Sequence, residues 1–287
     1  MVDLHVHSTR SDGTFTPTQL VDHAMEKGLI AFALTDHDTT DGIREASEYA
    51  ASLPNAPEII PGIELSTDLN GTEVHVVGLF IDPASPPFRD YLKEFVESRT
   101  TRNKKMAQKL RDLGMEITYE ALEEAFPDCI LTRAHFASYL RMHGYVSSNQ
   151  EAFDRYLGNR RPCYVPREKI SPCDAVKLIL SAGGLPILAH PILYRMSEAR
   201  LEDLVITLKK EGLVGIEAIY STYLPSEERQ IRRLATTHGL LISGGSDFHG
   251  ANKPKIDMGT GLGKLYVPDE VLEALRARLS ETPKPAL

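Results

Sequence analysis

Six of the ten histidines lie in short patches that also carry aspartate or glutamate. The patches fall at or near apolar runs that we expect to be strands, and together they supply His5, His7, Asp12, Asp36, His37, Asp38, Glu64, His75, His190, Asp247 and His249. Imidazole and carboxylate ligands suit Zn²⁺, Mn²⁺ or Fe²⁺. If the patches converge in space, they predict a cluster of divalent cations and therefore a metal-dependent hydrolase.

Taken one at a time, the patches have simpler interpretations. A histidine within a strand, such as His75, is more often a hydrogen-bonded core residue than a ligand. Asp36 and Asp38 could cap the helix expected from Asp41, and for Asp36 we favour a structural role. The Asp12 segment alone would be a turn. Repetition of the patches at successive strand ends favours the metal interpretation.

Short apolar runs and helical patterns alternate along most of the chain, and they must position these residues. Strands are expected at 2–6, 29–34, 59–65, 73–80, 185–189, 214–219 and 240–243. Helices are expected at 17–27, 41–52, 172–182, 200–211 and 225–238. The alternation predicts parallel βα units, whose active sites lie at the carboxyl ends of the strands. His75 falls inside a strand pattern, so its strand must be oriented toward the site.

Residues 99–166 break this rhythm. They show mostly helical patterns, no clear buried strand, and more lysine and arginine than aspartate and glutamate. We therefore predict a barrel formed by residues 1–98 and 167–287, with a small, mildly basic helical insertion domain at 99–166. Glu217, at the end of a predicted strand, is a candidate for supporting metal ligands from outside.

Composition excludes several classes of protein. A chain of 287 residues with 42% hydrophobic and 25% charged residues is ordinary for a globular α/β protein. Its formal net charge of −8 does not suggest a general nucleic-acid coat, so duplex DNA is not an expected partner. Three cysteines without Cys-x-x-Cys spacing predict reduced thiols. With no signal-peptide pattern and no membrane-spanning apolar run, we expect a cytoplasmic protein without a membrane partner.

The motifs match, in order, those of the PHP (polymerase and histidinol phosphatase) family, which the chain resembles over 1–98 and 167–287. The resemblance rests on the His-x-His pair with Asp12 and on the boxes at 35–38, 61–64, 75, 189–191 and 247–249. It implies a distorted (β/α)₇ barrel holding three ions, with Mn²⁺ as the expected metal and Zn²⁺, Fe²⁺ or Mg²⁺ as alternatives. The implied ligand groups are His5, His7, Glu64 and Asp247; Glu64, His75 and His190; and Asp12, His37 and His249. Some relatives carry histidine in place of Asp12, which leaves the identity of the third metal open.

Segments 131–135 and 161–166 resemble bacterial PHP phosphoesterases that act on nucleoside 3′,5′-bisphosphates. The resemblance implies removal of the 3′-phosphate, for example from phosphoadenosine phosphate to give AMP, by a metal-bound hydroxide held by Glu64 and Asp247. Substrate would be bound by Arg133, His135, Arg160 and Arg161, with His135 as a candidate proton donor. The alternative to substrate binding is that these arginines lie on a solvent-exposed face of the protein.

Other functions remain open at the level of sequence. One is a 5′→3′ exoribonuclease acting on short 5′-phosphorylated RNA. Another is a phosphatase for histidinol phosphate or another small phosphomonoester. The alternative from a different class is an inactive PHP binding module, which the complete set of nine candidate ligands disfavours. The sequence does not predict the oligomeric state.

Overall fold

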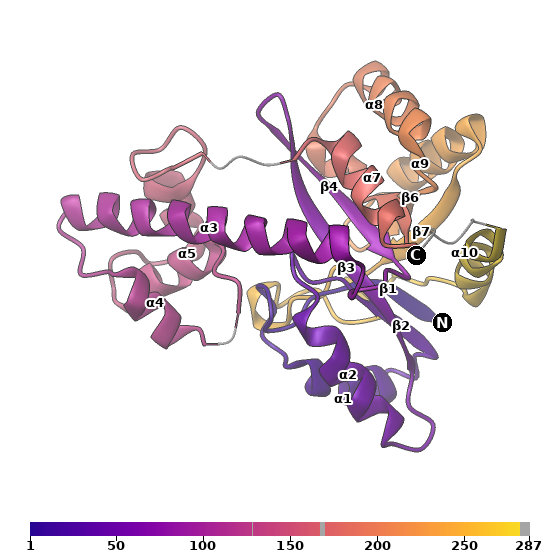
Figure 1. Ribbon diagram of the computed structural model, residues 1–287, viewed down its shortest axis with the longest axis horizontal. Coiled ribbons are helices and arrows are strands. Elements are labelled where there is room, and N and C mark those ends of the chain that lie inside the picture. Colours follow the sequence, from indigo (N-terminus) through magenta and orange to yellow (C-terminus); the bar gives the residue numbers. More distant parts are fainter. Residues whose placement is uncertain (128, 167–169, 282–287) are drawn as a thin grey trace. The chain divides into compact units, whose positions relative to one another are not determined.

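The computed structural model describes residues 1–127, 129–166 and 170–281. The chain divides into two compact units, Met1–Asp90 with Lys169–Leu287, and Tyr91–Glu168. The sequence pattern predicts boundaries at 99 and 166. Helix α3 (Pro86–Asp112) runs continuously through residue 99, so the change of pattern in the sequence falls inside a helix (Figure 1).

The first unit is built on one seven-stranded sheet whose strands follow one another in chain order. The strands are β1 (Val2–Val6), β2 (Ala31–Leu34), β3 (Glu58–Leu69), β4 (Thr72–Leu79), β5 (Leu185–Leu188), β6 (Gly215–Tyr220) and β7 (Leu241–Gly245). Neighbours pair in parallel, except that β4 is antiparallel to both β3 and β5. Six strands therefore direct their carboxyl ends to one end of the sheet, and β4 directs its amino end there.

Backbone hydrogen bonds bring the two edges of the sheet together. The N–H of His7 donates to the carbonyl of Phe248 at 3.0 Å, and the N–H of Asp247 donates to the carbonyl of His5 at 2.8 Å. These bonds join the end of β1 to the segment after β7, so the sheet nearly closes into a barrel. The predicted fold class, a distorted seven-stranded α/β barrel, is confirmed.

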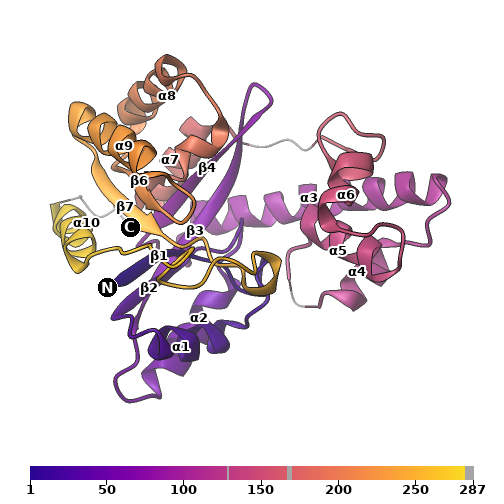
Figure 2. The ribbon, with the colours of Figure 1, turned by 180° about the vertical axis from the view of Figure 1, so that it is seen from behind.

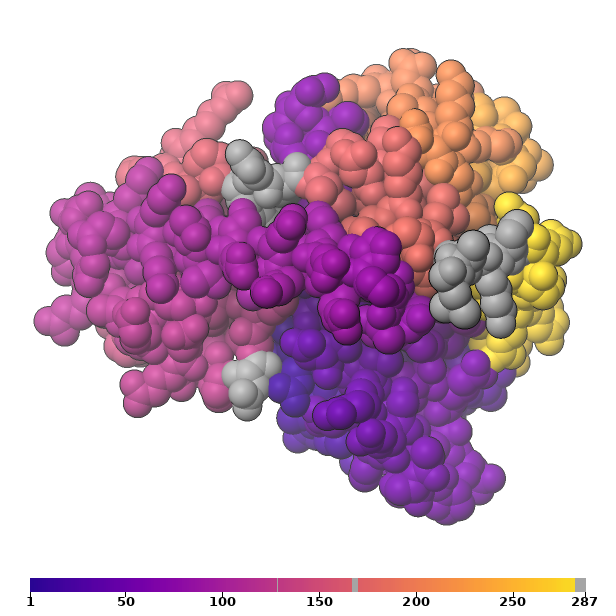
Figure 3. All heavy atoms as spheres, in the orientation of Figure 1, coloured from indigo at the N-terminus to yellow at the C-terminus, as the bar shows by residue number. Residues whose placement is uncertain are grey.

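Helices cover the outside of the barrel unit. They are α1 (Pro17–Glu26), α2 (Asp41–Ala51), α7 (Pro172–Ser181), α8 (Glu198–Glu211), α9 (Pro225–His238) and α10 (Asp269–Glu281). Figures 1 and 2 show α1 and α2 beside β1 to β3, and α7, α8 and α9 beside β4 to β7. In the space-filling view α7 and α8 present a continuous surface (Figure 3). Helix α1 begins at Pro17, as predicted. Thr16 just before it and Gln19 in the first turn form a reciprocal capping box.

Apolar strand residues form the core of the barrel. Leu4, Ile60, Leu79, Leu185 and Ile187 are almost fully buried. Every residue of β1, β2, β5 and β6 is buried. This explains why β2 and β5 are continuous apolar runs, whereas β1 and β6 also bury Asp3, His5 and Glu217. A close-packed core of this kind holds the strand ends, and the polar residues on them, in fixed positions.

The second unit is helical throughout its described residues. Besides the larger part of α3 it contains α4 (Tyr119–Ala125), α5 (Arg133–Met142), α6 (Asn149–Ala152) and the π-helical turn η1 (Phe153–Leu157). Its own core gathers Met106, Leu110, Phe136, Leu140 and Leu157. Among the helices of the described residues in either unit, none is both long and apolar enough to cross a bilayer.

Candidate metal centre

The carboxylate of Glu64 on β3 lies at the centre of the histidine cluster. Its Oε2 is 3.2 Å from a ring nitrogen of each of His5, His7 and His37. Its Oε1 is 2.8 Å from His75 Nδ1 and 2.8 Å from His190 Nε2. With a side chain only 1% exposed, Glu64 presents both oxygens to five imidazoles, which is the arrangement a bridging carboxylate requires.

His75 reaches this centre because of the direction of its strand. In β4 it pairs with Ser66 of β3, and its carbonyl accepts from the N–H of Ala189, just past the end of β5. Since β4 is antiparallel to both neighbours, its first residues lie beside the carboxyl ends of the others. The orientation that the sequence interpretation required of this strand is therefore present.

A second group gathers around Asp12, on the turn after β1. Asp12 Oδ1 lies 3.1 Å from His249 Nε2 and 3.9 Å from both His37 Nε2 and His7 Nδ1. The next residue must be glycine, because a Cβ at Gly13 would meet the carbonyl oxygen of His7 at 2.4 Å. The tight turn thus brings Asp12 back over the strand that carries the two histidines.

Asp247 completes the set from the segment after β7. Its Oδ1 lies 3.4 Å from His7 Nε2 and 3.3 Å from His249 Nδ1. Its backbone has a positive φ of 56°, a conformation that costs about 1–3 kcal/mol in a residue other than glycine. The hydrogen bond from its N–H to His5 holds this conformation, so the fold sustains local strain in order to direct the carboxylate inward.

The donor set suits divalent cations. The Nε2 atoms of His5 and His7 face each other at 3.1 Å, beside a carboxylate oxygen. Buried atoms Asp12 Oδ1 and His37 Nδ1 have no hydrogen-bond partner among the described residues. The electron pairs of these buried nitrogen and oxygen atoms point toward one another and repel unless cations lie between them. Three overlapping groups of ligand atoms each lie within 4.8 Å: His7, Asp12, His37 and His249; His5, His7 and Glu64; and His37, Glu64 and His75.

Electrostatics in the cluster keep the carboxylates ionised. Burial opposes the charge on Glu64, but the surrounding histidines, first among them His37, hold its pKa well below the usual range. Burial likewise opposes ionisation of Asp12, and His249 and His37 outweigh it and lower that pKa. Desolvation lowers the pKa of His37 to about 4, so its ring is neutral and has a free electron pair to offer.

Comparison with known proteins identifies the family. The model of the PHP domain matches residues 3–162. The chain belongs to the PHP family. The chain is 35% identical over 259 residues to a 3′,5′-nucleoside bisphosphate phosphatase of Chromobacterium violaceum, covering 90% of each chain. It is 37% identical over 247 residues to a 5′-3′ exoribonuclease of Haemophilus influenzae, covering 86% of this chain and 89% of that one.

A solved structure from Bifidobacterium adolescentis, assigned as a metal-dependent phosphoesterase, superposes on this PHP protein with a TM-score of 0.85. The two sequences are 27% identical, and the match covers 96% of each chain. The predicted enzyme class, a metal-dependent phosphoesterase, is confirmed at the level of the family. The structure also brings all nine predicted ligands of the PHP site within one buried region.

Residues around the PHP cluster hold its imidazoles and loops. Glu217 Oε1 contacts His5 Nδ1 at 3.1 Å, and Glu217 Oε2 accepts from the backbone N–H of His190 at 2.8 Å. The first contact leaves His5 Nε2 directed toward Glu64. Glu217 therefore has the geometry of a supporting residue, although it lies inside β6 rather than at the end of the strand as predicted.

The interpretation of Asp36 and Asp38 as helix caps is wrong. The N-cap of α2 is Thr40. Asp36 instead accepts from the backbone N–H and hydroxyl of Ser8 and from the hydroxyl of Ser11, at 2.6–2.8 Å, and Asp38 accepts from Ser66. Burial raises the pKa of Asp36 against these hydrogen bonds. The structural role favoured for Asp36 is confirmed: it fixes the loop that leads to Asp12.

Sequence reasoning missed Lys253. This lysine follows the short 3₁₀ turn Gly250–Asn252, and its Nζ lies 2.5 Å from Asp247 Oδ2. The same oxygen accepts from the hydroxyl of Tyr220 at 2.5 Å. A single lysine in a loop has no periodicity or motif to distinguish it, so only the folded chain reveals its proximity to the PHP cluster.

The four predicted substrate residues lie in the second unit. Arg133, the first residue of α5, donates to Asn159 at 3.1 Å, and its guanidinium lies over the rings of Phe153 and Tyr164. His135 is buried, and its Nδ1 accepts from the backbone N–H of Thr132 at 2.8 Å, forming the capping box of α5. Arg160 and Arg161 are exposed, and Arg160 has a positive φ of 65°.

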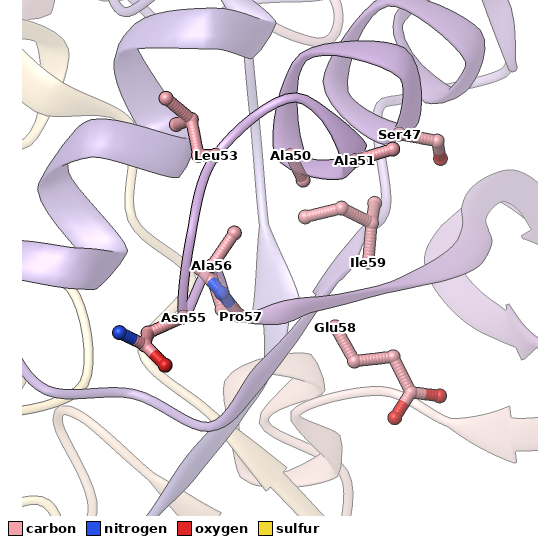
Figure 4. A pocket seen from close by; sticks show the side chains of 9 residues that line it. All are labelled: Ser47, Ala50, Ala51, Leu53, Asn55, Ala56, Pro57, Glu58 and Ile59. Atoms are coloured by element: carbon pink, nitrogen blue, oxygen red, sulfur yellow. The ribbon is translucent and has the colours of Figure 1, made fainter.

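A separate cavity of about 390 Å³ lies between the end of α2 and the start of β3 (Figure 4). Its walls include Ala50, Leu53 and Pro57, and its one charged side chain is Glu58, which pairs with Arg276. Because Glu58 begins β3 and Glu64 lies in the middle of that strand, the cavity lies at the amino end of β3, away from Glu64. It brings no second group of ligating residues to the PHP site.

Proposed function

We propose that this PHP protein hydrolyses the 3′-phosphate of nucleoside 3′,5′-bisphosphates. The observation that carries the proposal is a buried carboxylate, Glu64, whose two oxygens lie within 3.2 Å of five imidazoles. A relative named 3′,5′-nucleoside bisphosphate phosphatase aligns over 90% of the chain at 35% identity, which supports the substrate class.

Three divalent ions, Mn²⁺ by preference, would be held by overlapping ligand groups. The first group is His5, His7, Glu64 and Asp247, the second is Glu64, His75 and His190, and the third is Asp12, His37 and His249. The short distances from Glu64 and Asp12 to the histidines support these groupings. When bound, such ions neutralise phosphoryl charge and make a water molecule nucleophilic near neutral pH.

The protein's own residues orient and enclose the reacting groups. Histidine neighbours keep Glu64 ionised, and Lys253, followed by His249, keeps Asp247 ionised, so both supply negative charge that attracts the cations. Glu217 fixes the ring of His5, so that its Nε2 stays directed at the centre. Burial of His5, His7 and Glu64 to 1% exposure or less keeps bulk water away from these ligands.

Residues of the second unit would recognise the substrate. Arg133, Arg160 and Arg161 can bind the 5′-phosphate by charge-assisted hydrogen bonds. Because Nδ1 of His135 accepts from Thr132, a neutral ring carries its proton on Nε2. Donation of that proton to the departing 3′-oxygen is the role we propose for His135, whose Nε2 lies 3.9 Å from Cys129 Sγ.

The test is phosphate release from adenosine 3′,5′-bisphosphate by the Mn²⁺-loaded protein. Adenosine 5′-phosphate, adenosine 3′-phosphate and histidinol phosphate are compared, and a chelated sample is the control. We expect fast, metal-dependent release from the bisphosphate alone, leaving 5′-AMP. Preference for either monophosphate of adenosine or for histidinol phosphate would contradict the proposal. No turnover of any substrate by metal-loaded protein would favour an oligonucleotide substrate or an inactive binding module.

A second candidate function is 5′→3′ exoribonuclease activity on short RNA. The 37% identity to an enzyme of that name, over 86% of this chain, favours it. Both reactions cleave a bond at a ribose 3′-oxygen next to a 5′-phosphate, so one site could perform both. A 5′-phosphorylated tetranucleotide, compared with its 5′-hydroxyl form, separates them: release of 5′-mononucleotides from the phosphorylated form alone supports the nuclease.

A further inference from the structure

Asp247 uses its two carboxylate oxygens for different purposes. Oδ1 faces the imidazoles of His7 and His249, at 3.4 and 3.3 Å. Oδ2 faces away from them and is bonded at 2.5 Å to both Lys253 Nζ and the hydroxyl of Tyr220. Lys253 is therefore separated from the candidate metal centre by the width of a single carboxylate.

The loop that carries Lys253 is fixed to the loop that carries Asp12. The N–H of Ala251 donates to the hydroxyl of Thr14, and the side-chain amide of Asn252 donates to the carbonyl of Asp12, both at 2.8 Å. A Cβ at Gly250 would meet the Thr14 hydroxyl at 2.2 Å, so the close approach requires glycine there. The lysine thus stands where two ligand-bearing loops meet, and the two residues before it are bonded to the Asp12 loop.

Lys253 is charged and accessible, unlike the ligands beside it. Its side chain is 36% exposed, whereas Asp247 is 5% exposed and His7 is fully buried. Its Nζ pairs with the Asp247 carboxylate at 2.5 Å, and the exposed part of the side chain leaves ammonium donors that can reach an incoming anion.

A purely structural ion pair is a poor explanation for this placement. An ammonium beside a metal-ligating carboxylate repels the cation that the carboxylate attracts. Once a cation occupies the Oδ1 side, Asp247 attracts the ammonium less, and the ammonium can turn to an anion on the exposed side. Phosphoryl oxygens bound at a metal cluster are such anions.

We propose that Lys253 binds a non-bridging oxygen of the phosphoryl group that is cleaved. The inference rests on the proposed function, from which it takes the identity of the ligand as a phosphate ester. Tyr220, through its bond to the same oxygen, acts as a positioning residue that holds Asp247 when Lys253 turns to the substrate. Inorganic phosphate carries the same kind of non-bridging oxygen as a phosphate monoester. It is therefore a sufficient probe of binding by Lys253.

The experiment compares Lys253→Met, Lys253→Arg and Lys255→Met in the full chain. Lys255 is exposed two residues further along, so it is a matched control for loss of surface charge. Each variant is titrated with Mn²⁺ to saturation, and its metal content is measured. Binding of inorganic phosphate is then followed by calorimetry, and kcat and KM are measured with adenosine 3′,5′-bisphosphate.

We expect Lys253→Met to bind Mn²⁺ at least as well as the parent protein and to bind phosphate about 10- to 100-fold more weakly. Lys253→Arg should recover part of the phosphate affinity, and Lys255→Met should match the parent. Unchanged phosphate binding in Lys253→Met would overturn the proposal, as would failure of that variant to take up metal at any concentration. Unchanged phosphate binding would show that Lys253 only forms an ion pair with Asp247. Failure to take up metal would show that Lys253 has a structural role.

Failure of the proposed function would look different. Parent protein that binds phosphate through Lys253 but does not hydrolyse the bisphosphate would sustain the inference and contradict the proposed substrate. Parent protein that hydrolyses the bisphosphate, with Lys253→Met equally active and equally inhibited by phosphate, would contradict the inference alone.

Discussion

The barrel unit and the second unit hold the charged residues of the candidate site in opposite ways. In the barrel, Glu64 is 1% exposed and lies against five imidazoles. In the second unit, Arg160 and Arg161 are exposed, and Arg133 is stacked on aromatic rings and bonded to an amide. Charges removed from water interact strongly, and exposed charges are screened. We therefore expect substitutions of the barrel carboxylates to abolish the chemistry and those of the second unit's arginines to change substrate preference.

The largest effect is expected from Glu64→Gln. The amide keeps the shape of the side chain but removes the charge that faces five histidines, so metal loading should fall and turnover should drop by at least about 1,000-fold. Metal content and phosphate release measure the two effects. Glu48→Gln, on the exposed surface of α2, is the control. Full activity in Glu64→Gln would show that the cluster is not the reaction centre.

His135 tests whether the second unit contributes to chemistry or only to binding. Glutamine at this third helical position preserves a capping box with Thr132 but cannot donate a proton as an acid. If His135 protonates the leaving group, His135→Gln should lower kcat about 100-fold with unchanged thermal stability. His135→Ala should additionally lose about 1 kcal/mol of stability with the cap. A kcat in His135→Gln equal to that of the parent would leave His135 a structural role alone.

Arg133→Met should weaken binding more than chemistry. Loss of one charge-assisted contact to the 5′-phosphate should raise KM for the bisphosphate about tenfold, with metal content unchanged. Arg155→Met is a matched control, since Arg155 pairs with Glu151 on the surface of the same unit. Equal KM values for adenosine 3′,5′-bisphosphate in Arg133→Met and the parent would remove Arg133 from the substrate site.

The smallest expected effect is the release of protons from histidines of the barrel when metal binds. Burial opposes charge on His7 and His75, but the carboxylates of Asp247 and Glu64 outweigh it and raise these pKa values to about 9 and about 10. In metal-free protein the two charged rings therefore stabilise the fold fully below about pH 6.5, and this contribution is lost as pH rises through 9 to 10. Mn²⁺ loading at pH 7.5 should consequently release protons, and metal affinity should increase with pH.

Calorimetric titration with Mn²⁺ in two buffers of different ionisation enthalpy measures that release. His143→Gln is the control, because His143 caps the C-terminus of α5 in the second unit and contacts Tyr139 rather than a carboxylate. A binding enthalpy that does not depend on the buffer would contradict the predicted protonation of His7 and His75.

Local pattern predicted the fold and the ligand set, because both depend on short-range rules. Strand β1 and helix α9 have the predicted bounds, since buried strands are apolar runs and helix ends carry caps and glycines. Helix α10, near the end of the chain, was missed. The chemistry of the ligands follows from residue type, and their convergence follows from the rule that parallel strands end together.

The tertiary structure decided what depends on strand direction and on distant partners. Only the antiparallel course of β4 explains how His75, inside a strand, reaches the carboxyl ends of its neighbours. Asp36 looked like a cap for the next helix, and folding joined it to Ser8 and Ser11, 28 and 25 residues away. Lys253 and Tyr220 carry no signal in the sequence, yet they share one oxygen of Asp247.

The sequence by itself therefore determined the class of chemistry, because nine candidate ligands at or near strand ends have few other uses. It also determined the α/β barrel, because the spacing of hydrophobic residues and the residues that cap helices are local properties of the sequence. The tertiary structure alone decided which oxygen faces which nitrogen. Those distances arise from packing and hydrogen bonds between distant segments, such as the bond between Asp3 and Ser246, which are 243 residues apart, and no local pattern encodes them.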